Sequence, residues 1–97
     1  MKIRILDPAI EDIAKARIFY DHQALGLGAY FMDSIFGEID SLVLYAGVHS
    51  IRHDYHRLVV RKFPFAVYCN LENEMAVVYR ILDCRRDPVW IQKQLTG

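Results

Sequence analysis

Arg85 and Arg86 stand between a predicted strand and a predicted helix, at a point where an anion could be bound. The Asp87-Pro88 pair that follows is typical of a helix start, with aspartate as the N-cap and proline in the first turn. Guanidinium groups beside the exposed N–H groups of a helix N-terminus form a physically reasonable phosphate site. An equally good interpretation is that one arginine pairs with Asp83 or Asp87 and only fastens the corner.

Three histidines, His49, His53 and His56, lie close enough in the sequence to surround a metal ion. A zinc site needs three or four ligands in a fixed geometry, and no regular element is predicted here that would fix one. We therefore expect a polar loop that holds no metal. The neighbouring basic residues are Arg52, Arg57, Arg61 and Lys62. A histidine in such a basic rim can exchange a proton near neutral pH and act as an acid or a base.

Tyr68 and Arg80 belong to a predicted β-hairpin, which is the element that the other candidates surround. Two apolar runs, residues 63–69 and 75–82, flank a polar tip at residues 70–74. This pattern predicts an antiparallel hairpin with its turn centred near Asn73. Residues Arg61 and Lys62 then lie just before the first hairpin strand.

This register predicts one apolar and one mixed face. The apolar pairs are Phe65 with Ile81, Val67 with Tyr79 and Cys69 with Val77, and the mixed pairs are Ala66 with Arg80 and Tyr68 with Val78. A sheet of this kind needs cover on one side only, so the mixed face is the predicted functional surface. We expect Val67 on the apolar face to contribute much more to stability than Arg80 on the other.

The remaining helices and strands are predicted from the spacing of apolar residues and from the residues that begin or end such elements. We predict strands at residues 2–6 and 57–61 and helices at residues 7–22, 29–46 and 89–95. The buried stripes of the two long helices are Ala9, Ile13, Ala16 and Tyr20, then Phe31, Ile35, Ile39, Leu42 and Ala46. The order β-α-α-β-β-β-α predicts an α+β fold of two layers, in which an antiparallel sheet is covered on one face by a helical hairpin.

Length and composition limit the classes of protein to consider. The 97 residues predict a single domain, residues 1–97, and the 54% hydrophobic content excludes a disordered chain. Basic and acidic residues number 12 each, so net charge does not predict binding to nucleic acid or to a membrane. Residues 1–48 are net acidic and residues 49–97 are net basic. This distribution indicates either a local anion-binding patch in the basic half or only a balance of charge between the two halves. With no predicted leader or membrane span, and with Cys69 and Cys84 expected as free thiols, the cytoplasm is the expected location.

Residues 57–88, with "RKFPFAVYC", a short acidic tip and "ILDCRRDP", resemble the RelE/ParE superfamily of toxins from bacterial type II toxin–antitoxin modules. The stretch "FYDHQALGLGAYFMDSIFGEIDSL" is similar to the helical hairpin of that family, and "ILDPAIEDI" to its first strand and helix. The resemblance covers nearly the whole chain. It implies a growth inhibitor, of the kind linked to plasmid stabilization, that a cognate antitoxin neutralises. The antitoxin is expected to bind as a disordered segment that folds onto the toxin. The expected assembly is a homodimer or a heterotetramer with the antitoxin.

The resemblance also bears on mechanism, because RelE-like members are ribosome-dependent endoribonucleases and ParE-like members poison DNA gyrase. The nuclease branch uses basic residues on the sheet, of which Arg85 matches one, but the place of its sheet arginine is held by Phe65. It also uses a C-terminal tyrosine, and here Trp90 follows without any tyrosine after Tyr79. The chain is therefore more similar to the ParE-like branch, for which no enzymatic activity and no cofactor are expected.

Three hypotheses follow: a gyrase poison, a ribosome-dependent ribonuclease, and a toxin-derived binding domain without activity. For a gyrase or ribosome contact, the predicted target-binding residues are Arg61, Lys62, Tyr68, Arg80, Arg85 and Arg86. For a ribonuclease, the catalytic candidates are His53, His56, Arg61, Lys62 and Arg85.

Overall fold

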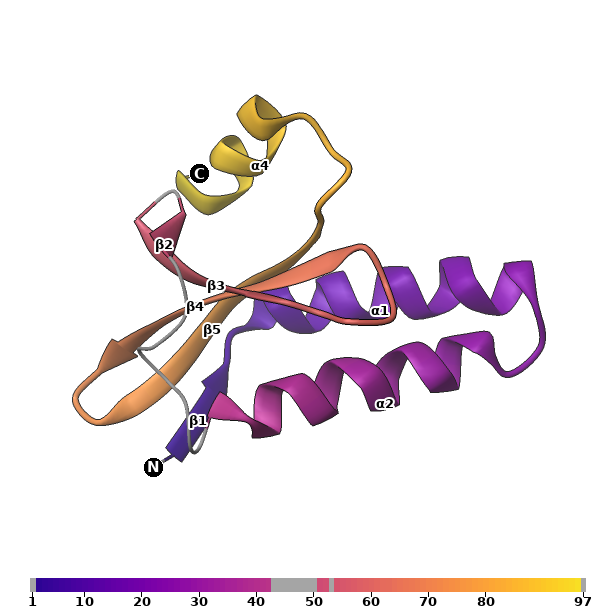
Figure 1. The fold of residues 1–97 in the computed structure, drawn as a ribbon, viewed down its shortest axis with the longest axis horizontal. Coiled ribbons are helices and arrows are strands. Elements are labelled where there is room, and N and C mark those ends of the chain that lie inside the picture. Colours follow the sequence, from indigo (N-terminus) through magenta and orange to yellow (C-terminus); the bar gives the residue numbers. More distant parts are fainter. Residues whose placement is uncertain (1, 43–50, 53, 97) are drawn as a thin grey trace.

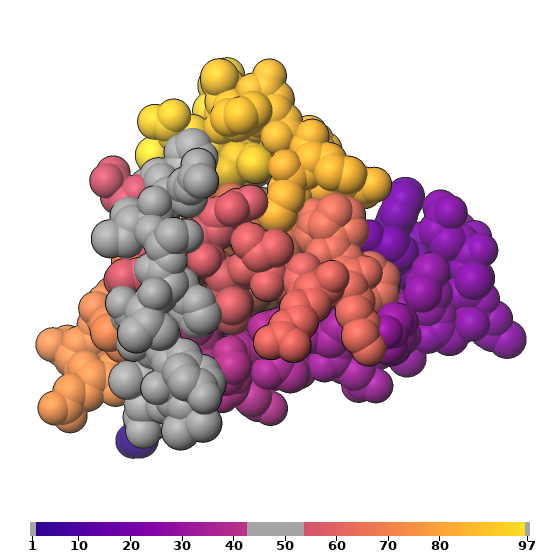
Figure 2. Space-filling view, in the orientation of Figure 1, coloured from indigo at the N-terminus to yellow at the C-terminus, as the bar shows by residue number. Residues whose placement is uncertain are grey.

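A helical hairpin lies against one face of a twisted sheet, and a short C-terminal helix lies near the opposite face (Figure 1). In the space-filling view, the C-terminal helix (yellow) and the helical hairpin (purple) lie on different sides of the strands (Figure 2). The computed structural model describes residues 2–42, 51–52 and 54–96. Its strands are β1 (Lys2–Ile5), β2 (Ile51–Arg52), β3 (Tyr55–Val59), β4 (Phe65–Glu72) and β5 (Met75–Asp83). Its helices are α1 (Asp7–Gln23), α2 (Leu27–Asp40) and α4 (Pro88–Thr96). The predicted α+β fold and its element order are confirmed. None of the described helices is long and apolar enough to cross a membrane.

The apolar stripes of the two long helices form the main core with the sheet. Ala9, Ile13, Ala16 and Tyr20 of α1 are all buried, as predicted from their spacing. The predicted residues of the second stripe are also buried as far as Leu42. Its last member, Ala46, lies outside the described residues. Helix α1 begins at Asp7, as predicted, with Leu6 as its N-cap.

The turn between α1 and α2 depends on two glycines. Gly26 has a φ of 84°, a left-handed conformation that favours glycine. The amide of Gly28 donates a hydrogen bond of 2.9 Å to Oδ1 of Asp21. A Cβ at Gly28 would lie 2.6 Å from the backbone oxygen of Arg17, so only glycine allows the helices to approach this closely.

The sheet has the strand order β1-β5-β4-β3-β2. Strands β3, β4 and β5 pair antiparallel, as predicted. Strand β2, in a segment for which no regular element was predicted, pairs antiparallel to β3, and β1 pairs parallel to β5. The expectation of a wholly antiparallel sheet is wrong at this edge. A tight turn would have imposed the antiparallel direction, whereas β1 is separated in sequence from its partner β5 by both helices of the hairpin.

The predicted hairpin register is wrong by one residue near the tip and by two beyond a bulge. The turn residues Asn73 and Glu74 have φ values of 50° and 63°, so Glu72 pairs with Met75 across a two-residue turn. The actual pairs further along are Cys69 with Val78, Tyr68 with Arg80 and Val67 with Ile81. Tyr79 is the extra residue at this shift, which is a β-bulge. None of the five predicted pairs is therefore formed.

The second face of the sheet is covered, contrary to the prediction of one mixed, open face. Ala66, Tyr68 and Leu82 are buried there against Ile91 and Leu95 of α4. Tyr68 retains only 1% of its surface exposed. Strand residues alternate between faces, and a shift of two residues leaves Ala66 and Tyr68 on the face predicted as mixed. That face is closed because the apolar side of helix α4 packs on it.

Candidate functional site

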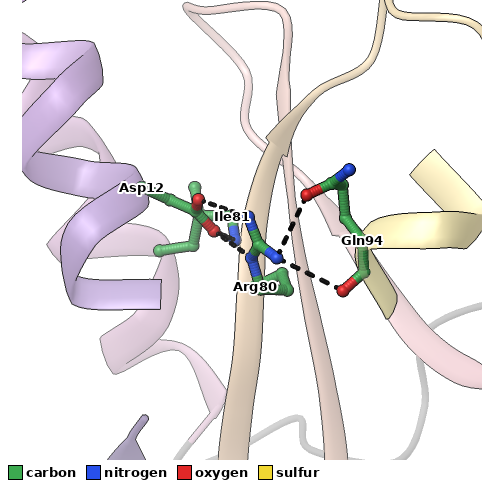
Figure 3. Close-up of polar contacts among 4 residues, drawn as sticks. All are labelled: Asp12, Arg80, Ile81 and Gln94. Atoms are coloured by element: carbon green, nitrogen blue, oxygen red, sulfur yellow. Dashed lines mark hydrogen bonds and ion pairs between the residues drawn. The ribbon is translucent and has the colours of Figure 1, made fainter. Parts of the chain in front are cut away.

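Arg80 links three elements on the α4 side of the sheet (Figure 3). Its Nε and Nη2 donate hydrogen bonds of 2.7 and 2.8 Å to the two carboxylate oxygens of Asp12 in α1. Its Nη1 donates to the backbone oxygen of Gln94 in α4 at 3.2 Å. The hydrogen bond to Asp12 is the main reason that the pKa of Arg80 is raised. The predicted target-binding guanidinium is thus held inside the fold.

Asp12 also completes the edge of β5. Strand β1 pairs with β5 only as far as Val78. Further along β5, the amide of Ile81 donates a hydrogen bond of 3.0 Å to Oδ2 of Asp12. The side chain of Asp12 is 10% exposed, so this carboxylate is a nearly buried acceptor of three hydrogen bonds. The sequence indicated only an acid that suits a helix N-terminus, and no local signal connects Asp12 to Arg80.

Tyr68 belongs to a partly buried polar contact with Arg57 and Cys84. Arg57 is the cross-strand neighbour of Tyr68 and donates from Nη2 to Sγ of Cys84 at 3.3 Å. Burial lowers the pKa of Arg57, but hydrogen bonds to Tyr68 and Cys84 raise it and prevail. Sequence reasoning placed Arg57 in a basic rim and missed this contact, which only a correct strand pairing reveals. Both cysteines are free thiols, as expected.

Two aspartates, Asp83 and Asp87, stabilise the turn between β5 and α4. Nε and Nη2 of Arg85 donate to the two carboxylate oxygens of Asp83 at 3.1 and 2.8 Å. This contact is the main reason that the pKa of Asp83 is lowered and that of Arg85 raised. Oδ1 of Asp87 accepts the amide of Val89 at 2.7 Å, so a carboxylate already lies at the helix N-terminus. Of the two interpretations of this corner, the geometry favours a structural role for Arg85.

Arg86 differs from Arg85, because its guanidinium lies over the ring of Trp90, with Cζ 3.8 Å from the ring centroid. Arg86 is exposed and Trp90 is half-buried against the second core. A cation held on an aromatic face is fixed in place without losing its charge. Arg86 therefore keeps a charge that a partner can contact.

Arg61 and Lys62 precede β4 and lie against α2. The side chain of Arg61 is 89% exposed, with Nε 3.9 Å from Oε1 of Glu38. Nζ of Lys62 lies 5.0 Å from the ring centroid of Tyr30. The predicted target-binding set is thus divided between α2 for this pair and the α1–α4 side for Arg80, Arg85 and Arg86.

His56 is the one histidine of the predicted trio that the structure describes, and His49 and His53 lie outside the described residues. It lies in β3 opposite Cys69, half-buried, on the same face as the core residue Leu58. Because neighbouring strand residues point to opposite faces, His56 does not share a face with Tyr68. Within the described residues no cluster of three or more His, Cys, Asp or Glu side chains could hold a metal ion.

An apolar groove on the helical hairpin is a further candidate that sequence reasoning did not localise. It measures about 490 Å³ and lies on the side of α1 that carries Ile10 and Ile18, with Met32 and Phe36 of α2 opposite. Ile10, Ile18 and Phe36 are 51%, 60% and 38% exposed. We call this surface the hairpin groove; its lining residues are Ile5, Ile10, Ile13, Ala14, Arg17, Ile18, Asp21, Met32 and Phe36. Contiguous exposed apolar surface of this kind is typical of a protein interaction site.

Comparison with known proteins supports the expected fold. No family model and no curated protein matches the sequence. A structural match was found to a chain of the structure titled "Chromosomal ParDE TA system from P. aeruginosa", with a TM-score of 0.75 and 15% sequence identity. The match covers 84% of this chain and 92% of the other. The predicted fold is thereby confirmed, since this chain has the same fold as a chain of that toxin–antitoxin structure.

Proposed function

We propose that this protein is the toxin of a type II toxin–antitoxin module, a growth inhibitor that a cognate antitoxin neutralises. The observation that carries the proposal is the fold shared with a chain of a ParDE toxin–antitoxin structure over 84% of the residues. The toxin-like motifs in residues 57–88 support it independently, because they were recognised from the sequence alone. We infer a cytoplasmic location, where the proposed targets act.

The antitoxin is expected to place an amphipathic helix in the hairpin groove. Ile10, Ile18 and Phe36 form an exposed apolar stripe that a second helix can bury, and Arg17 with Asp21 provides a polar rim. Docking of an amphipathic helix into such a groove is a common mode of recognition. A segment that is disordered when free can fold on this surface and bind it tightly enough to suppress activity.

For the toxic activity we favour a ParE-like action on DNA gyrase over RNA cleavage. Cleavage by attack of a 2′-hydroxyl needs a positioned acid, a positioned base and cations for the phosphate. Arg80 and Arg85 are engaged by aspartates, and His56 faces the main core. Arg61, Lys62 and Arg86 remain exposed, and we propose them as the contacts with the target.

Induction of the protein in a bacterial host tests the function. We expect growth arrest with filamentation and an SOS response, with thymidine incorporation falling before methionine incorporation. An immediate stop of protein synthesis with cleavage of ribosome-bound mRNA would instead support a RelE-like ribonuclease. Normal growth at verified expression of folded protein would support the third hypothesis, a domain without activity.

Substitutions in the hairpin groove test the antitoxin site. Ile18→Asp places a charge in the proposed interface, and loss of such an apolar contact typically weakens binding by ~30-fold or more. The variant should remain toxic and escape neutralisation by the cognate antitoxin, which is to be sought in the neighbouring reading frames. Leu71→Asp is the matched control, because Leu71 is 44% exposed at the tip of the β4–β5 hairpin, outside the groove. Equal neutralisation of both variants would place the antitoxin elsewhere.

A further inference from the structure

The outer edge of β5 is only partly occupied. Strand β1 pairs with β5 over Met75–Val78, but β5 continues to Asp83. At this edge the amide of Ile81 is bound by Asp12. Because backbone groups of a strand alternate between its two edges, the carbonyl of Ile81 and the amide of Asp83 point to the same outer edge.

The pairing on the other side of β5 confirms this direction. Phe65 lies opposite Asp83, and its carbonyl accepts the amide of Val60 at 2.8 Å, away from β5. The Phe65–Asp83 pair is therefore one whose backbone groups are not bonded to each other. In the described part of the chain, β5 is flanked only by β1 and β4. The carbonyl of Ile81 and the amide of Asp83, which precede and follow Leu82, therefore have no strand beside them.

This free edge lies in an open groove between α1 and α4, which we call the edge groove. Its volume is about 480 Å³, within the ~300–1,000 Å³ of typical ligand sites. Phe19 of α1 is 51% exposed on one wall, and Trp90 of α4 forms the other. The lining residues are Asp12, Lys15, Ala16, Phe19, Tyr20, Phe65, Arg80, Ile81, Leu82, Asp83, Arg85, Arg86, Trp90 and Gln94.

The charges of the edge groove do not balance. Its two carboxylates, Asp12 and Asp83, are each bound by an arginine of the same groove, at 2.7 and 2.8 Å. The two other cations, Lys15 and Arg86, have no carboxylate within 4.0 Å among the described residues. The edge groove is therefore positive, and a segment that enters it is favoured if it is acidic.

We propose that the edge groove binds an extended acidic segment of a partner protein, which adds to the sheet as a strand beside β5. The backbone of the segment would donate to the carbonyl of Ile81 and accept from the amide of Asp83, while acidic side chains meet Lys15 and Arg86. A peptide fits this edge better than a phosphate does, because a peptide backbone offers a donor for the carbonyl of Ile81 and an acceptor for the amide of Asp83 at the spacing of a strand. The site lies on the opposite side of α1 from the hairpin groove and goes beyond the proposed function.

The test uses the full chain, labelled with ¹⁵N by cell-free synthesis so that toxicity does not limit yield. The probe is the peptide acetyl-Glu-Val-Glu-Val-Glu-Val-amide, followed by NMR. We expect it to shift the resonances of the Asp83 amide and the Trp90 indole and to slow hydrogen exchange at Asp83. The lysine counterpart and a form N-methylated at alternate residues should bind at least ten times more weakly.

Two variants distinguish charge-dependent binding of the peptide from nonspecific binding. The double variant Lys15→Glu, Arg86→Glu should weaken binding of the acidic peptide by ~3- to 30-fold at low salt. Arg17→Glu, on the side of α1 that faces the hairpin groove, should leave it unchanged. The proposal is overturned if the Asp83 amide does not respond, or if the N-methylated peptide binds equally. It is also overturned if inorganic phosphate gives the same shifts and displaces the peptide, since the groove would then be an anion site.

Discussion

Replacing Asp12 by alanine should destabilise the protein more than any surface substitution, because Asp12 holds α1, β5 and, through Arg80, α4 together. The change removes two charge-assisted hydrogen bonds from Arg80 and leaves the Ile81 amide without its acceptor. Breaking a fully buried ion pair costs about 3–5 kcal/mol. The two side chains here are 21% and 10% exposed, so solvent screens part of this interaction. We expect a loss of about 3 kcal/mol in the free energy of unfolding, the unpaired amide included.

Urea unfolding followed by circular dichroism measures this loss directly. For a domain of this size, ~3 kcal/mol lowers the melting temperature by roughly 12–24 °C. Glu11→Ala is the matched control, because it removes an exposed acid from the adjacent position of α1 and costs at most ~1 kcal/mol through the helix dipole. Asp12→Asn should fall between the two, since the amide oxygen can still accept one hydrogen bond.

A double-mutant cycle with Arg80→Ala assigns the loss to this pair. We expect a coupling of about 1.5–3 kcal/mol between the two positions. The contacts of Arg80 thus lead us to expect a large contribution to stability, in place of the small one inferred from the sequence. If Asp12→Ala costs no more than Glu11→Ala, or if the coupling is below about 0.5 kcal/mol, the role assigned to Asp12 is refuted.

Four other substitutions test the packing and the pH dependence of stability. Val67→Ala should cost about 1–3 kcal/mol in urea unfolding, because Val67 is fully buried between the hairpin strands and the helices, and a loss below ~0.5 kcal/mol would contradict this. Gly28→Ala should destabilise the helical hairpin by at least ~1 kcal/mol through its clash with Arg17, whereas Gly37→Ala, with open space around it, should stabilise by up to ~1 kcal/mol. Burial raises the pKa of Cys69 from 9.0 to about 11, so the unfolded chain releases this proton first. Stability should therefore fall as the pH rises from 9 to 11, and Cys69→Ala should lack this component of the decline.

The sequence by itself determined the described helices, the presence of the β4–β5 hairpin and the α+β fold class. The spacing of Ala9, Ile13, Ala16 and Tyr20 defines one helix face, and a face of this kind must be buried whatever it meets. The Asp87-Pro88 start of α4 was also readable, because an N-cap acts on the amides directly after it. These signals are local, so no knowledge of distant contacts is needed to interpret them.

The strand register and the second core were decided by the tertiary structure. Two features change which side chains share a face of the hairpin. The turn consists of Asn73 and Glu74, and Tyr79 is an extra residue in β5. A shift of one residue exchanges the two faces of a strand, and the apolar runs are too continuous to define it. Only the packing of α4 against Tyr68 therefore shows which side chains the second face buries.

The candidate sites depended on the tertiary structure even more strongly. The sequence indicated which cations are available, but it did not show that Asp12 binds Arg80 across 68 positions of the chain. It likewise did not show that the exposed side of α1 forms a groove with Phe36 of α2. Whether an arginine is free to bind a partner depends on which carboxylate lies within hydrogen-bonding distance, and that is determined only when distant segments are brought together by folding.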